Sequence, residues 1–144
     1  MTPPPRSAAR APRSPRTADG SARPGAVATA LAGWFVPGAG HALQGQAQKA
    51  AVFALVLILM FAIGLGLGGR LFAFQTADPL TFLVAAAEWG ALGPRAIGAL
   101  TGLGRGDVVA VTYEYGNAFL IASGLLNVLV ILDAVDLTSG RKPQ

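Results

Sequence analysis

The chain has 144 residues, of which 53% are hydrophobic and 12% are charged, and it contains no cysteine. Soluble domains carry about 25% charged residues, so this composition excludes an ordinary soluble globule and indicates a membrane protein. The lack of cysteine excludes a disulfide framework, a thiolate metal site and a cysteine nucleophile. The single histidine excludes a multi-histidine metal site.

The net charge of +4 lies entirely in the first 25 residues. This arm has five arginines, one aspartate and six prolines, whereas residues 26–144 carry six basic and six acidic residues. It buries too little apolar surface to offset the entropy of ordering, so we expect a disordered basic cytoplasmic tail over 1–25. A cleaved signal peptide with its apolar region at 26–36, or an organellar transit peptide, are the alternatives. Because the folded part is neutral, no nucleic-acid partner is expected.

Two segments predict transmembrane helices. Crossing a hydrocarbon core of about 30 Å takes about 20 apolar residues in a helix. Residues 50–69 contain no charge and lie between Lys49 and Arg70, which are suited to the two interfaces. Residues 116–134 follow two tyrosines and contain Asn127, which we expect to face another helix.

Two further apolar segments, 26–43 and 79–94, are short or interrupted. The first contains the break Pro37-Gly38-Ala39-Gly40, and the second contains Glu88 and ends at Pro94. Free backbone groups cannot face lipid, so each segment either crosses as a short helix or is re-entrant and covered by other helices. The fold class is therefore an all-α membrane protein, a small polytopic helical bundle.

The membrane domain is expected over 26–138, followed by a short basic tail at 139–144. Every combination of two to four crossings places eight basic residues on the side of the N-terminus and three on the other. The positive-inside rule therefore predicts an inside N-terminus and leaves the number of crossings open. An even number would also keep the C-terminal Arg141 and Lys142 inside.

The glycine run at 64–69 matches the dinucleotide pattern G-x-G-x-x-G. That motif binds a pyrophosphate only between a strand and the start of a helix, whereas this run closes an apolar helix. Gly64 and Gly68 have the G-x-x-x-G spacing that brings helices close together, so we predict packing and no cofactor.

Four ionisable residues are candidates for a polar network. Glu88 is open to three interpretations: an interfacial residue facing water, a structural ion pair, or a proton or ion relay. Asp133 and Asp136 share a helical face at a helix C-terminus, where the dipole disfavours anions and a specific partner is expected. That partner is either one of the basic residues Arg141 and Lys142 or a residue of 37–49. His41 is expected to hydrogen-bond carbonyls freed at the break or one of the two aspartates.

The stretch 31–41, followed by Gly45, Lys49 and a long apolar helix, resembles the start of the two-transmembrane (TM-two type) domain family. There a first helix leads through a Gly-x-Gly-x-His-like turn to a second helix. Residues 116–142 are similar to the end of a related bacterial family of small membrane proteins of unknown function. Residues 42–44 depart from the pattern, which has aromatic residues there. The resemblance implies a membrane protein with its termini inside and no known catalytic residues.

Together these patterns predict an integral protein of the bacterial cytoplasmic membrane, of structural or interaction type. We expect an accessory subunit or homo-oligomer that is not an enzyme, with the lipid bilayer and other membrane subunits or itself as partners. No small-molecule substrate is identifiable. The alternative is a transport or proton-relay component that uses in-membrane carboxylates. The residues expected to form helix contacts or the polar network are Pro37, Gly40, His41, Gly45, Gly64, Gly68, Asn127, Asp133 and Asp136, with Glu88 as the relay residue.

Overall fold

The computed structural model describes residues 24–74 and 78–138, and within these ranges the chain is helical, with one isolated β-bridge. The predicted basic arm, except for its last two residues, and the predicted C-terminal tail lie outside the described residues. In chain order the elements are α1 (Ala26–Phe35), α2 (Ala39–Leu43), α3 (Ala47–Gly66), α4 (Pro79–Glu88), the 3₁₀ turn η1 (Trp89–Ala91), α5 (Leu92–Leu100) and α6 (Tyr113–Thr138).

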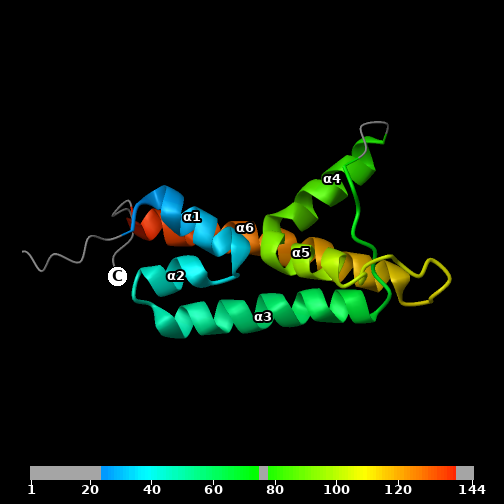
Figure 1. Cartoon of the computed structure of the whole chain (residues 1–144), viewed down its shortest axis with the longest axis horizontal. Coiled ribbons are helices and arrows are strands. Elements are labelled where there is room, and N and C mark those ends of the chain that lie inside the picture. Colours follow the sequence, from blue (N-terminus) through cyan, green and yellow to red (C-terminus); the bar gives the residue numbers. More distant parts are fainter. Residues whose placement is uncertain (1–23, 75–77, 139–144) are drawn as a thin grey trace, which may run out of the picture.

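Two long antiparallel helices, α3 and α6, form the frame of the molecule (Figure 1). Both are long and apolar enough to cross a membrane, as the sequence predicts. At 1.5 Å per residue, the twenty residues of α3 extend about 30 Å. Only 22% of the apolar window of α3 and 28% of that of α6 are buried, which favours lipid-facing helices over the core helices of a soluble protein.

The boundaries of the two helices differ from the prediction by a few residues. The helix predicted at 50–69 begins at Ala47 and ends at Gly66, because Gly68 adopts the left-handed conformation with φ of +84°. The helix predicted at 116–134 extends from Tyr113 to Thr138.

Small side chains let α3 and α6 approach closely at the end where α3 stops. A Cβ atom added to Gly64 would lie 2.8 Å from Leu120 Cγ, and one added to Gly69 would lie 2.8 Å from the carbonyl carbon of Gly116. Near the centre of both helices, the hydroxyl of buried Ser123 donates to the carbonyl of Leu57 at 3.1 Å. α3 and α6 therefore pack directly against each other, with a hydrogen bond between them near their centres.

The segment 26–43 forms a hairpin that enters and leaves at the same end of the frame (Figure 1). α1 has ten residues and extends about 15 Å, half of a hydrocarbon core. The chain turns at Gly38, whose φ of +82° and close approach to the backbone of Ala50 leave no room for a side chain. α2 then returns towards the start of α3.

A second hairpin, α4–η1–α5, approaches from the opposite end, and its α4 leans away from the other helices (Figure 1). Asp78 begins α4 by accepting hydrogen bonds from the Thr81 hydroxyl and the Leu80 N–H, which lower the pKa of this carboxyl. The helical path continues past the predicted end at 94 to Leu100. Between α5 and α6, residues 108–112 form turns and a bend.

Candidate functional site

The tips of the two hairpins meet beside the middle of α6. The indole Nε1 of Trp34, near the end of α1, donates to the carbonyl of Trp89 at 2.6 Å. Gly93, in the first turn of α5, lies so close to the carbonyl of Phe35 that a Cβ there would overlap it. The C-terminal end of α1 thus faces the N-terminal part of α5, an arrangement in which the helix dipoles attract.

Asn127 on α6 joins the two tips. Its side chain is fully buried, and its Nδ2 donates to the carbonyl oxygens of Gly33 at 3.1 Å and Gly90 at 2.8 Å. The first acceptor is near the end of α1 and the second is in η1. One amide therefore uses both of its donors to hold hairpins that enter from opposite ends.

The two acceptors are the carbonyls that proline leaves without a helical donor. In an α-helix, each carbonyl accepts from the N–H four residues later. Four residues after Gly33 stands Pro37, and four residues after Gly90 stands Pro94, and proline has no N–H. A buried carbonyl without a donor is costly, so Asn127 supplies what both prolines lack.

Glu88, immediately before η1, forms a buried ion pair with Arg95 on α5. Its Oε2 lies 2.6 Å from Arg95 Nη1 and also accepts the N–H of Phe72 at 2.9 Å. Arg95 donates in addition to the carbonyl of Phe72. The side chain of Glu88 is fully buried, which disagrees with an interfacial residue facing water, and its contact with Arg95 is the one expected for a structural ion pair. The pair fixes the loop at Phe72 to the second hairpin.

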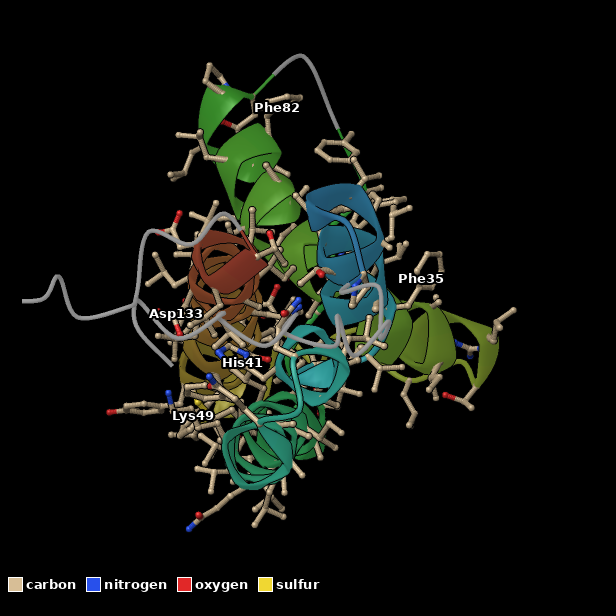
Figure 2. The ribbon with its side chains drawn as sticks, turned by 90° about the vertical axis from the view of Figure 1, so that its left-hand side faces the viewer. Phe35, His41, Lys49, Phe82 and Asp133 are labelled. Atoms are coloured by element: carbon tan, nitrogen blue, oxygen red, sulfur yellow. The ribbon has the colours of Figure 1, made fainter. Side chains whose placement is uncertain are left out.

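His41 on α2 pairs with Asp133 on α6, which confirms one of the two partners expected for this histidine. The two side chains point toward one another in Figure 2, and Nε2 lies 3.0 Å from Oδ2 of Asp133. His41 is fully buried and its ring packs against Phe53 on α3 at 5.0 Å between centroids. Asp136 lies one turn further along α6 and is half-buried. The pair ties the first hairpin to α6.

The glycines predicted to pack divide into two groups. Gly40 lies against Ala134, and Gly64 lies against α6, as expected for packing residues. Gly68 is outside α3 in a turn, so its predicted role as the second G-x-x-x-G contact is wrong, and Gly69 makes that approach instead. Gly45 has φ of +77° and open space around it, which indicates a turn rather than a packing role.

Sequence reasoning missed Arg95, Gly33, Gly90, Gly93 and Gly124. Gly124 on α6 lies against the carbonyl of Ala87, where a Cβ would overlap. A signal was present for two of them, since Gly-x-x-x-Pro occurs at 33–37 and again at 90–94. Within the described residues no group of three or more His, Cys, Asp or Glu side chains is arranged to hold a metal ion.

Residues 28–143 match DUF6677, described as a family of unknown function. The match begins inside α1 and runs beyond the end of α6, so it includes both hairpins and both long helices. No curated protein and no solved structure matches the chain. Because the family match takes in most of the sequence, the chain belongs to the DUF6677 family.

Proposed function

We propose that this chain is an integral protein of the bacterial cytoplasmic membrane, of structural or interaction type, acting as an accessory subunit or homo-oligomer without chemistry of its own. The observation that carries the proposal is the use of its buried polar side chains. Asn127, Ser123, and the Glu88–Arg95 pair all hold the chain's own elements together. Bonds of this kind support a scaffold within the bilayer.

The proposed topology has two crossings, α3 and α6, with both termini inside and with each hairpin re-entrant. α1 and α4, at ten residues each, extend about 15 Å and reach only to mid-depth. Ala47→Cys and Ala110→Cys test it, since the natural chain has no cysteine. An impermeant thiol reagent added to intact cells should label position 110 and spare position 47. Labelling of both or neither would contradict the topology.

The surface proposed to meet a partner is the outer part of α4. Its side chains Leu80 and Leu83 are 70% and 64% exposed, and α4 projects from the bundle (Figure 1). An apolar arm of this kind suits a neighbouring membrane helix, either of another subunit or of a second copy. By contrast, Gly40, Gly64 and Asn127 make their contacts inside the chain.

Native mass analysis of the tagged protein, extracted in mild detergent, tests the partner. The expected result is a fixed stoichiometry with a second protein or with itself, weakened by Leu80→Ala with Leu83→Ala. The matched control is Leu55→Ala with Leu59→Ala on α3, where the leucines are 61% and 50% exposed. A wild-type monomer, or equal losses in both double variants, would count against an α4 interface.

The second proposal is a proton or ion relay at Glu88. One oxygen of its carboxyl group, Oε1, is buried without a hydrogen-bond partner among the described residues. A carboxyl oxygen of this kind is available to a proton. In the fraction of the protein that remains folded and assembled, Glu88→Gln should then abolish a measured proton or ion flux. Unchanged flux would remove the relay.

A further inference from the structure

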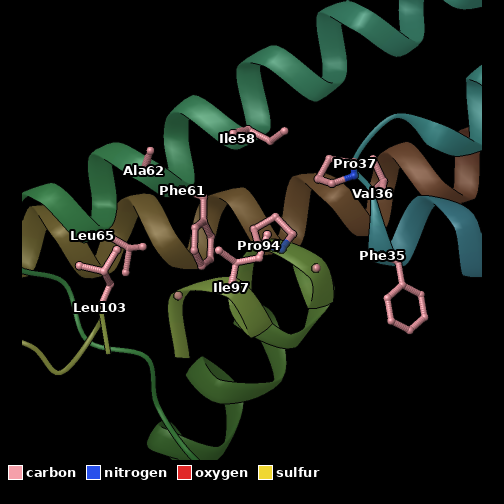
Figure 3. Close-up of a pocket in the computed structure, with 12 residues that line it drawn as sticks. Phe35, Val36, Pro37, Ile58, Phe61, Ala62, Leu65, Pro94, Ile97 and Leu103 are labelled. Atoms are coloured by element: carbon pink, nitrogen blue, oxygen red, sulfur yellow. The ribbon is translucent and has the colours of Figure 1, made fainter. Parts of the chain in front are cut away.

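An apolar groove runs along one side of α3, between that helix and α5 (Figure 3). Its volume is about 290 Å³. Pro37 lies at one end, Phe61 and Ile97 lie in the middle, and Leu65 and Leu103 lie at the other end. The side chains of α1, α3 and α5 that line the groove are apolar. The groove therefore suits a hydrocarbon and offers no hydrogen-bond partner to a polar ligand.

The shape and depth of the groove fit an extended chain. The lining residues of α3 lie between Ile58 and Leu65, a stretch that extends about 10 Å along the helix axis. One end lies at the hairpin tips beside the middle of α6, and the other is next to the last turn of α3. The groove therefore covers about two-thirds of the depth of one leaflet, which is about 15 Å of a 30 Å hydrocarbon core.

Two exposed arginines stand beside the end formed by Leu65 and Leu103. Arg105 follows Leu103 by two residues and faces Arg70 across an antiparallel bridge, which the Leu71 N–H closes on the Gly104 carbonyl at 2.8 Å. Neither arginine forms an ion pair within 24–74 and 78–138.

Like charges directly opposite each other on paired backbones destabilise the pairing. The nearby carboxylate of Asp107 accepts the N–H of Val109 and makes no salt bridge to Arg70 or Arg105. The Arg70 guanidinium lies over the Phe72 ring, 5.6 Å from its centroid, and that of Arg105 lies beside Gly102, so neither has a counter-charge among the described residues. A phosphate bound by both arginines would supply that counter-charge, and arginine matches the geometry of a phosphate.

We propose that the groove binds one acyl chain of an anionic phospholipid from the leaflet opposite the N-terminus, with the lipid phosphate between Arg70 and Arg105. The hydrocarbon lies against Phe61 and Ile97 and ends at the hairpin tips. This inference rests on the membrane location proposed above and is independent of any protein partner.

The groove is tested by native mass spectrometry of the purified full chain, titrated with phosphatidylglycerol. The wild type should retain one lipid tightly. Ala62→Trp, which places a large ring in the groove, should abolish that retention. The matched control is Ala51→Trp on the exposed surface of α3 away from the groove, and it should bind as the wild type does. Equal binding by Ala62→Trp and the wild type would overturn the proposal.

The headgroup is tested with the double variant Arg70→Gln, Arg105→Gln. Each basic residue near an anionic lipid surface is worth about a factor of five, so the variant should bind phosphatidylglycerol about thirtyfold more weakly. Its binding of zwitterionic phosphatidylcholine should change little. Lys49→Gln, at the opposite end of α3, is the control and should keep the preference. A wild type without preference, or a preference that survives in the double variant, would overturn the phosphate assignment.

Alkaline carbonate extraction separates this proposal from the location on which it rests. Release of the wild-type protein by carbonate would contradict membrane integration, and the lipid proposal would fall with it. A carbonate-resistant protein whose lipid retention ignores Ala62→Trp would overturn the groove alone.

Discussion

Replacing Asn127 with leucine removes the two hydrogen bonds that hold the hairpin tips and keeps the number and branching of the side-chain heavy atoms. The carbonyls of Gly33 and Gly90 lose their donor. Pro37 and Pro94 offer no N–H in its place. We therefore expect Asn127→Leu to loosen both hairpins together, without a large loss of packing around α6.

The size of the effect follows from the two bonds and their burial. Hydrogen bonds between helices in a membrane average about 0.6 kcal/mol each, which sets a lower limit of about 1.2 kcal/mol for the pair. A buried carbonyl left without a donor costs about 1–3 kcal/mol. Since Asn127 is fully buried, water cannot easily replace it, and we expect a loss of about 2–4 kcal/mol.

Tryptophan fluorescence is suited to this measurement, because both tryptophans of the chain lie at the junction. Trp34 and Trp89 are joined by a hydrogen bond. Unfolding in detergent, driven by dodecyl sulfate and followed by this emission, gives the free energy. The control is Asn117→Leu, the same change on the same helix, where the side chain accepts a single N–H from Arg70 at 2.8 Å near the helix end. Equal stability losses in the two variants would refute the reasoning.

Two other predictions concern close contacts and charge. Gly93→Ala should destabilise by about 1–3 kcal/mol through overlap with the α1 backbone, whereas Gly66→Ala, which meets nothing within 4 Å, should be neutral or gain up to about 1 kcal/mol. Thermal midpoints compare them, and equal midpoints would contradict the close approach. Glu88→Gln should destabilise, by up to about 3–5 kcal/mol, because it leaves the Arg95 guanidinium without a counter-charge. Adding Arg95→Gln should recover part of the loss in a double-mutant cycle; no recovery would argue against a coupled pair.

The two long helices were predictable because a continuous apolar run longer than the bilayer core has few alternatives in sequence. The same reasoning did not settle whether residues 26–43 and 79–94 cross the membrane, because a short apolar helix has the same sequence pattern whether it crosses or turns back. Their return depends on contacts with α6 at Gly40 and Gly124, which a single sequence does not display.

The candidate site was predicted in part for a similar reason. Asn127 was expected to face a helix because polar groups avoid lipid, and His41 was expected near the aspartates. The acceptors of Asn127 lie 94 and 37 residues away from it, and Arg95 meets Glu88 only after η1 turns the chain. The spacing of Gly64 and Gly68 suggested a helical contact that the left-handed turn at Gly68 rules out.

The order of elements bears on the choice between scaffold and transporter. Each half of the chain has a half-length helix, a Gly-x-x-x-Pro break, a second short helix and a long helix, and the long helices run antiparallel. Transporters with such inverted halves bind their substrate at mid-depth, between broken helices that leave polar groups open to it. Here the two carbonyls that the prolines leave without a helical donor accept hydrogen bonds from Asn127. The hairpin tips also touch each other through Trp34 and Gly93. A junction closed in this way favours a scaffold, and Asn127→Leu is the change that would open it.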